Sequence, residues 1–276
     1  NMDKSKIEKY KNTNVSIRLG EQPTGDEDVD SVYLSPIVDM SNEFVQKFKK
    51  RNIEVTGEIQ LAYDCSKKAK FIGITGTNGK TTTTSMVGDI YKLYDKNSFV
   101  VGNIGNVALE AVIKADENAN FITELSSFQL ESITTLRVHI GAILNITPDH
   151  IERHKTYEEY KKAKYRIAEN QTSEDFLILN KDDEEIDIRD VKSKIIYFSM
   201  KEKFKDGVYY DNDRQMIVST LFGENQDIVK REDISLFGDH NVENTLAAVA
   251  ISLCDNIPIE IIREGIKNFV AVKHRL

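Results

Sequence analysis

A glycine-rich loop between an apolar run and a helical pattern has the residues best suited to chemistry. Residues 75–82 read Thr-Gly-Thr-Asn-Gly-Lys-Thr-Thr and follow an apolar run at 71–74. Glycines let backbone N–H groups face a phosphate, and the start of the next helix adds partial positive charge. Lys80 can reach the outer phosphates, and the Thr81 hydroxyl suits Mg²⁺. Ile74 stands where the strict phosphate-loop pattern has glycine. We nevertheless predict a nucleotide phosphate site built from Gly76, Thr77, Asn78, Gly79, Lys80, Thr81 and Thr82.

Two more candidates follow predicted strands. Glu124 ends an apolar strand expected at 119–123, and His150 follows one expected at 138–145, with Asp149 beside it. The carboxyl ends of parallel strands share one sheet edge, where ligands bind. A carboxylate there can hold Mg²⁺, and a neutral imidazole can ligate a divalent cation. Alone, Glu124 fits an exposed strand-end acid equally well, and His150 fits a surface or structural histidine better than a ligand. Their common edge with the phosphate loop favours a site.

Three other segments are less specific. Residues 102–106 form a glycine- and asparagine-rich turn that fits either a polar substrate contact or a plain loop. Residues 237–244, Phe-Gly-Asp-His-Asn-Val-Glu-Asn, open a predicted helix. The lysines and arginine of the helix expected over 156–170 fit a solvated basic face, and their spacing does not single out Lys164.

The elements that must position these residues alternate from residue 70 onward. We predict strands at 70–74, 98–101, 119–123, 138–145, 176–180 and 194–198, with helices near 80–94, 106–115, 156–170 and 239–254. This alternation favours an α/β fold of the P-loop type, a mostly parallel sheet with helices on both faces. Short strand patterns within 207–236 predict a small antiparallel meander. The preceding strand–helix–strand segment is too short for a complete domain, so we expect a partial Rossmann-like domain there.

Composition limits the function classes. The 276 residues carry a net charge of −8, which argues against non-specific binding to nucleic acid or membranes. We find no apolar run of about 18 residues and no signal peptide. Two cysteines argue against a disulfide framework and fit a reduced compartment. We therefore expect a cytoplasmic monomer that binds neither nucleic acid nor membranes.

Five segments, in chain order, resemble the motifs of the Mur ligases, ATP-dependent enzymes that add amino acids to the peptidoglycan precursor. They are residues 75–82, 102–105, 124–131, 145–150 and 238–244. The string Glu-Leu-Ser-Ser-Phe-Gln-Leu-Glu at 124–131 and the residues 57–61 are most similar to the D-glutamate-adding branch of the family. The resemblance runs from about residue 30 to the end of the chain.

The resemblance implies a reaction and its cofactors. ATP would phosphorylate the terminal carboxylate of UDP-N-acetylmuramoyl-L-alanine, and the amine of D-glutamate would attack the resulting acyl phosphate. ATP and two Mg²⁺ ions are the implied cofactors. Lys80 would contact the outer phosphates, Thr81 and Glu124 would serve the ATP-side Mg²⁺, and His150 the second ion. Lys164 matches a carbamylated lysine that also serves the metal, so Lys80, His150 and Lys164 are the catalytic candidates.

The resemblance also assigns binding contacts and domains. Asn103 matches a contact to the muramoyl substrate, Asn244 an adenine contact, and Arg275 an interdomain arginine at the nucleotide phosphates. Residues 1–66 would be a remnant of the UDP-substrate domain, and residues 67–276 the central ATP-binding domain. The third domain, which supplies most of the amino-acid pocket, would follow the point where this chain ends. We therefore expect this chain alone to be an inactive fragment of the enzyme.

Three alternatives remain open on sequence alone. They are another Mur ligase, a folylpolyglutamate synthase, and a non-catalytic nucleotide-binding module. Residues 128–130 and 103–105 favour the D-glutamate-adding branch over the first two. A pure binding module has no need of the metal-side candidates Glu124, His150 and Lys164.

Overall fold

The structure is a computed structural model and describes residues 8, 10 and 12–270. Arg275, the expected nucleotide-phosphate contact, lies outside the described residues. The chain divides into two compact units. The smaller takes the residues up to Val32 and Met40–Val55, and the larger takes Tyr33–Asp39 and the chain from Thr56 onward. Among the described residues, none of the helices is long and apolar enough to cross a membrane.

The segment from residue 31 to residue 57 forms a strand, a helix and a second strand. Helix α2 (Glu43–Lys50) buries Val45 and Phe48. Strands β1 (Ser31–Leu34) and β2 (Glu54–Gly57) pair as a two-stranded sheet. This strand–helix–strand order agrees with the order expected from the sequence.

The larger unit is built on a nine-stranded sheet with the order β11-β10-β9-β8-β7-β6-β3-β5-β4. The strands are β3 (Lys70–Thr75), β4 (Ser98–Gly102), β5 (Asn120–Glu124), β6 (Ile140–Ile143), β7 (Phe176–Asn180), β8 (Lys194–Ser199), β9 (Gly207–Asp211), β10 (Met216–Ser219) and β11 (Gln226–Lys230). Neighbours from β4 to β9 pair in parallel, whereas β10 is antiparallel to both β9 and β11. The predicted mostly parallel sheet and the predicted meander are thus confirmed, and the meander extends the parallel sheet at one edge.

The helices of the larger unit include two short ones that the sequence pattern did not predict, α6 and α7. The full set is α3 (Glu58–Asp64), α4 (Lys80–Tyr94), α5 (Ala108–Lys114), α6 (Ser127–Glu131), α7 (Ile151–His154), α8 (Tyr157–Tyr165), α9 (Asp239–Cys254) and α10 (Ile259–Asn268). The expected helix over 156–170 is α8 followed by a 3₁₀ turn, Arg166–Ala168. The expected strand over 138–145 is only β6. The apolar pattern runs past β6 because Val138 and Leu144 are buried beyond its ends.

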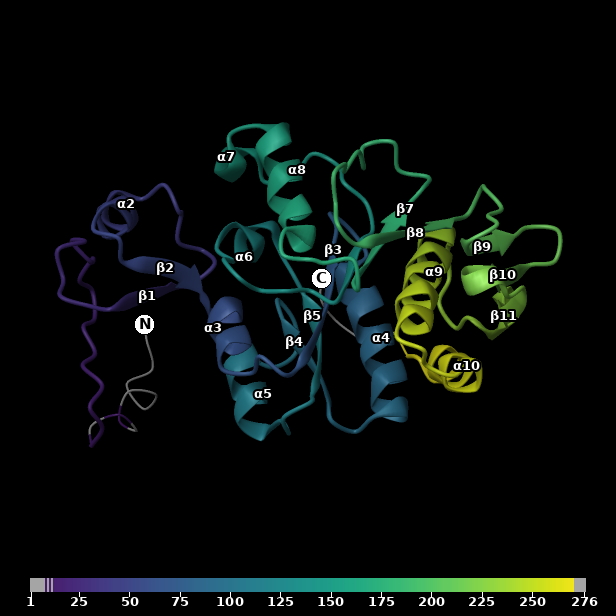
Figure 1. Ribbon diagram of the computed structural model, residues 1–276, viewed down its shortest axis with the longest axis horizontal. Helices are drawn as coiled ribbons and strands as arrows, with labels where there is room; N and C mark the ends of the chain where they lie inside the picture. The colour runs from purple at the N-terminus through teal and green to yellow at the C-terminus, as the bar shows by residue number, and fades with distance from the viewer. Residues whose placement is uncertain (1–7, 9, 11, 271–276) are drawn as a thin grey trace. The chain divides into compact units, whose positions relative to one another are not determined.

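Helices cover both faces of the sheet, as predicted. Successive side chains of a strand point to opposite faces, and β3 shows this directly. Ile72 and Ile74 belong to a core shared with α4, α9 and α10. Phe71 belongs to a second core, with Phe121 and residues of α3, α5 and α8. In Figure 1 the yellow helices α9 and α10 lie beside α4, with which both pack.

The sheet order places four strand ends together. Strands β6, β3, β5 and β4 are consecutive and parallel, so the segments after them leave from one edge. These segments carry the phosphate loop after β3 and the candidates Asn103, Glu124 and His150. The crevice at the carboxyl ends of such strands is where ligands bind in open α/β sheets.

Candidate functional site

The phosphate-loop candidates lie between β3 and α4. Gly79 precedes α4 with φ of +82°, in the left-handed region that residues with a Cβ rarely adopt. A Cβ on Gly79 would also lie 2.2 Å from Oδ1 of Asn244. Glycine is therefore required at this position for two independent reasons. The N-terminus of α4 follows directly, and its free N–H groups favour an anion there.

Asn145, which sequence reasoning left without a role, ties the loop to the end of β6. Its Oδ1 accepts hydrogen bonds from the backbone N–H groups of Thr77 at 3.1 Å and Asn78 at 2.8 Å. Its Nδ2 donates to the Asn78 carbonyl at 3.1 Å. From α8, the Tyr160 hydroxyl lies 3.0 Å from the Thr77 Oγ1. The signal for Asn145 was its place at the carboxyl end of a predicted strand, as for Glu124.

The two candidate lysines meet at the loop. Lys80 Nζ donates to the carbonyls of Gly76 and Thr77, each at 2.8 Å. Lys164 Nζ, from α8, donates to the same Gly76 carbonyl at 2.7 Å and is buried. Burial, followed by the positive charge of Lys80, lowers the pKa of Lys164 to about 7. Burial also lowers the pKa of Lys80. A large fraction of Lys164 is therefore a neutral amine near neutral pH.

Glu124 joins two other candidates at the end of β5. It is 1 % exposed. Its Oε2 accepts a hydrogen bond from Thr81 Oγ1 at 2.9 Å, and its Oε1 accepts one from Asn103 Nδ2 at 2.7 Å. The structure therefore brings together the predicted metal pair Thr81 and Glu124, with the predicted substrate contact Asn103 on the other carboxylate oxygen.

These oxygen donors fit a magnesium ion that is held mainly by a nucleotide. Within the described part of the chain, no group of three or more His, Cys, Asp or Glu residues is placed to hold a metal. Mg²⁺ keeps several waters and is commonly bound through one or two carboxylates plus substrate phosphates. Glu124 and Thr81 supply such a partial set. The Lys164 ammonium does not fit a cation site in its charged form.

His150 lies immediately before α7 with φ of +51°. Its ring centroid is 5.0 Å from that of Phe128 in α6, and its Nε2 is 3.5 Å from the Asp149 carboxylate. The negative charge of Asp149 raises the pKa of both Lys80 and Lys164, against the larger effect of burial. Asp149 therefore links the His150 turn to the lysines electrostatically, which makes it a further candidate.

A groove of about 580 Å³ opens beside the loop. It is lined by Asn78, Gly79, Thr82, Asn145, Leu236, His240, Asn241, Glu243 and Asn244. Asn244 accepts a hydrogen bond from Thr83 Oγ1 at 3.3 Å and donates to Asn241 Oδ1 at 3.3 Å. The groove thus joins three phosphate-loop candidates to the predicted adenine contact, Asn244.

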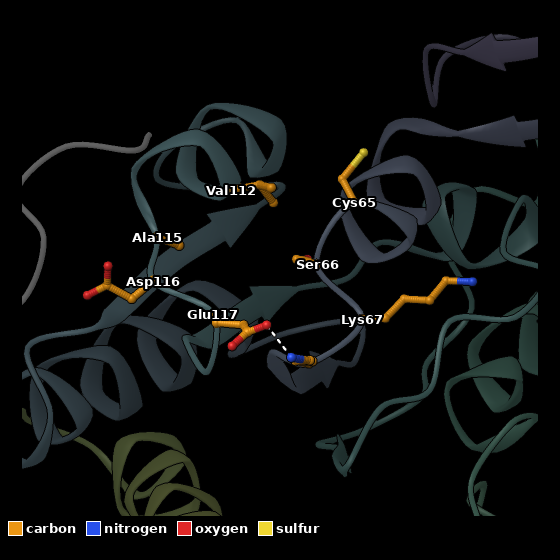
Figure 2. A pocket seen from close by; sticks show the side chains of 8 residues that line it. Cys65, Ser66, Lys67, Val112, Ala115, Asp116 and Glu117 are labelled. Atoms are coloured by element: carbon orange, nitrogen blue, oxygen red, sulfur yellow. Dashed lines mark hydrogen bonds and ion pairs between the residues drawn. The ribbon is translucent and has the colours of Figure 1, made fainter.

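A second cavity, shown in Figure 2, lies away from these residues. Its volume is about 220 Å³, and its lining includes Cys65, Val112 and Asp116. Lys68 and Glu117 also line it and form an ion pair, drawn as a dashed line in Figure 2. None of the predicted site residues lines this cavity.

Comparison with known proteins identifies the family of the chain. The Mur ligase middle domain family matches residues 74–252. Over 259 residues the chain is 44 % identical to the UDP-N-acetylmuramoylalanine–D-glutamate ligase of Clostridioides difficile (strain 630), covering 93 % of this chain and 57 % of that protein. The ligase of the same name from Caldanaerobacter subterraneus subsp. tengcongensis is 38 % identical over 276 residues, which are 99 % of this chain and 60 % of that protein.

Solved structures share the fold. A UDP-N-acetylmuramate:L-alanyl-gamma-D-glutamyl-meso-diaminopimelate ligase from Neisseria meningitides matches with a TM-score of 0.64 at 16 % identity, over 89 % of this chain and 80 % of that one. MurF from Acinetobacter baumannii matches with a TM-score of 0.58 at 21 % identity, over 77 % of this chain and 48 % of that one.

The fold and its glycine-rich loop define an α/β domain of the P-loop type. The family match covers more than half of the chain and includes the loop, Glu124, His150 and Lys164. The chain therefore belongs to the Mur ligase family. It spans somewhat more than half the length of the curated relatives that it matches.

Proposed function

We propose that the full-length protein containing this chain ligates D-glutamate to UDP-N-acetylmuramoyl-L-alanine with hydrolysis of ATP to ADP. The observation that carries this proposal is the position of Glu124, which contacts both Thr81 of the phosphate-loop helix and Asn103. One carboxylate thereby joins the nucleotide side of the site to the proposed substrate side. Sequence identity of 38–44 % to ligases named for this reaction supports the choice of substrates.

The proposed chemistry overcomes the poor reactivity of a carboxylate as an acyl donor. An oxygen of the substrate carboxylate attacks the γ-phosphorus of ATP, and ADP leaves. The amine of D-glutamate then attacks the acyl carbon, and the carbon–oxygen bond to phosphate breaks. The products are an amide, inorganic phosphate and a proton. Positioning and electrostatic stabilisation do most of the work in phosphoryl transfer.

Each candidate residue then has a defined role. Lys80 exchanges its contacts with loop carbonyls for contacts with the outer phosphates. Thr81 and Glu124 would hold an ATP-side Mg²⁺, and His150 would hold a second ion. Bound Mg²⁺ neutralises charge on the phosphates during transfer. Asn244 and the groove beside it receive the adenine, and Asn103 contacts the muramoyl substrate.

Lys164 carries a carbamate under this proposal. Its neutral amine attacks CO₂ and loses a proton, so an ammonium becomes an anion beside Lys80. A pKa of about 7 supports this step because it leaves much of the amine unprotonated near neutral pH. The carbamate anion would remove the repulsion between the positive charges of Lys80 and Lys164 at the Gly76 carbonyl. It would also suit a neighbouring Mg²⁺ ion. Native mass spectrometry with ¹³C-labelled bicarbonate tests the modification, with Lys164→Arg as the unlabelled control.

The remaining parts of the proposal concern the domain boundaries, the location of the protein and its partners. We assign residues 1–66 to the UDP-substrate domain and residues 67–276 to the ATP-binding domain. We place the protein in the cytoplasm as a monomer acting on small molecules, without nucleic-acid or membrane partners. The net charge of −8 supports the last point. Sedimentation of the full-length protein tests the monomer.

Phosphate release by the full-length protein tests the reaction. The assay contains Mg-ATP, UDP-N-acetylmuramoyl-L-alanine and one amino acid at a time: D-glutamate, L-lysine or meso-diaminopimelate. Release with D-glutamate alone, lost in Lys80→Ala, supports the proposal. Release with a different amino acid would instead indicate a sister ligase, and release with none would favour a folate-type or binding function.

A further inference from the structure

Glu131, the last residue of α6, holds the short helix α7 from one side. Its Oε1 lies 3.0 Å from His154 Nδ1, and its Oε2 accepts a hydrogen bond from Arg153 Nη2 at 3.1 Å. One carboxylate therefore binds two consecutive side chains of α7. The function proposed above assigns Glu131 no role, although it ends the string at 124–131.

Helix α7 needs such support because both its ends are strained. The helix is a single turn of four residues, Ile151–His154. His150 before it has φ of +51° and Lys155 after it has φ of +71°, and neither is glycine. Left-handed conformations of residues other than glycine cost about 1–3 kcal/mol and persist only where surrounding contacts impose them. A lone helical turn does not supply that energy by itself.

Other contacts of the same two side chains complete the attachment. His154 is buried, and its Nε2 lies 2.9 Å from Ser127 Oγ in α6. The Arg153 guanidinium lies 4.9 Å from the Phe128 ring centroid and also donates to the carbonyls of Ile37 and Val38 at 3.1 and 3.0 Å. Arg153 and His154 thus share two neighbours in α6, the ring of Phe128 and the carboxylate of Glu131.

The attachment reaches the proposed catalytic histidine through an aromatic stack. Phe128 contacts both histidine rings, with centroid distances of 5.0 Å to His150 and 5.4 Å to His154. The His150 carbonyl also accepts the backbone N–H groups of Arg153 and His154, at 3.1 and 3.0 Å. The backbone conformation of His150 and the position of its ring therefore both depend on α7 staying in place.

We infer that Glu131 is a positioning residue, which sets the place of His150 by anchoring Arg153 and His154 of α7. The inference rests on the proposed function only for the role of His150; the mechanical part concerns the ligand-free protein. Glu131 touches no substrate in this account and acts only through α7. Its removal should loosen α7 first and reduce turnover as a consequence, because small misplacements of a catalytic group reduce rates by up to about 10²-fold.

Amide hydrogen exchange in the ligand-free, metal-free full-length protein tests the mechanical part. The variant is Glu131→Gln, which removes the negative charge that faces both Arg153 and His154. The backbone N–H groups of Arg153, His154 and Lys155 should exchange at least about tenfold faster than in the wild type, while those of α4 stay unchanged. Unchanged exchange in α7 would overturn the inference.

Kinetics of the same variant test the functional part. We expect kcat to fall at least about tenfold with the KM for ATP within about twofold, because α7 contributes no residue to the nucleotide groove. A kcat within twofold of the wild type would overturn the inference. If ligation fails in the wild type but α7 exchange responds to Glu131→Gln, the proposed function fails and the anchoring survives.

Two further variants separate positioning from loss of stability. Asp175→Asn is the control, because Asp175 is also a carboxylate bound to an arginine, Arg137, but is buried just before β7 and away from α7. It should lower the melting temperature while α7 exchange and kcat stay at wild-type values. If Glu131→Gln does not fold, hydrogen exchange in α7 and kcat are measured in Arg153→Lys instead. This variant keeps the positive charge but loses the guanidinium group that bonds to Glu131 and to the carbonyls of Ile37 and Val38 at the same time.

Discussion

Lys80 and Lys164 donate hydrogen bonds to one and the same carbonyl oxygen, that of Gly76, at 2.8 and 2.7 Å. Two ammonium groups thus converge where both lose much of their hydration. Burial, with the charge of Lys80 as a second cause, lowers the pKa of Lys164 to about 7. Such a pair is unfavourable in the empty protein and becomes favourable when negative charge arrives. The arrangement suits a site that receives a triphosphate or that converts one lysine into an anion.

Lys164 should make the stability of the protein depend on pH. Its pKa is lowered in the folded state, so between pH 7 and 10.5 the unfolded chain binds a proton that the folded chain does not. Stability therefore rises with pH in this window, by up to about 5 kcal/mol, and the burial penalty is fully present below pH 7. Thermal melting in CO₂-free buffer at pH 7, 8 and 9 should show a steeper rise for the wild type than for Lys164→Met. Equal slopes of melting temperature against pH in the two proteins would contradict a lowered pKa of Lys164.

Gly79→Ala should damage the loop more than a left-handed conformation alone explains. The new Cβ would lie 2.2 Å from Asn244 Oδ1, in addition to the backbone strain at φ of +82°. Gly223→Ala is the control, because Gly223 has φ of +79° and open space around it. We expect the free energy of unfolding to fall by about 1 kcal/mol in the control and by at least about 1 kcal/mol more in Gly79→Ala. Gly79→Ala should also lose ATP binding. Equal losses in thermal and ATP-binding measurements would show that the contact with Asn244 is unimportant.

Glu124→Gln should raise the magnesium requirement of the reaction. The amide keeps the shape of the side chain but removes the negative charge next to Thr81 Oγ1. We expect the Mg²⁺ concentration at half-maximal rate to rise by about 10–100-fold at fixed ATP. Glu117→Gln, which breaks an exposed ion pair with Lys68, should leave it unchanged. A magnesium titration that is the same for Glu124→Gln and the wild type would exclude Glu124 as a metal-side residue.

Lys80→Ala should reduce kcat while leaving the fold intact. The hydrogen bonds of Lys80 Nζ go to two loop carbonyls, and no side chain loses a hydrogen bond when this lysine is truncated. A fixed positive charge at a transferring phosphoryl group accelerates the reaction by about 10²–10³-fold. Lys92→Ala, on the exposed face of the same helix, is the control. Phosphate release that falls less than tenfold in Lys80→Ala would remove this residue from the catalytic candidates.

The local part of this site could be predicted from the sequence, whereas the part made by packing could not. Glycine spacing and the alternation of apolar runs are local, so the loop and the sheet edge with Glu124 followed from them. Lys164 has the same residue type as its neighbours on α8 and differs only in burial, at 2 % exposed against 69 % for the side chain of Lys162. Only the family resemblance singled it out.

Helix α7 had no sequence signal either. Left-handed backbone is normally marked by glycine or asparagine, and here it occurs at His150 and Lys155. The conformation is imposed by contacts to Glu131 and the segment around Ile37, which are distant in the sequence. The expected strand over 138–145 was too long for a related reason. Buried apolar residues continue the pattern beyond the residues that pair in β6. Periodicity alone does not distinguish paired strand residues from buried residues that flank the strand.

Transfer of an oxygen label tests the central claim most directly. The full-length protein is given Mg-ATP, D-glutamate and UDP-N-acetylmuramoyl-L-alanine with ¹⁸O in its terminal carboxylate, and the inorganic phosphate is analysed by mass spectrometry. Attack of the carboxylate on the γ-phosphorus, followed by cleavage of the carbon–oxygen bond, predicts one ¹⁸O atom in each phosphate released. Unlabelled phosphate, or label found in AMP, would contradict the assignment of this site to acyl-phosphate chemistry.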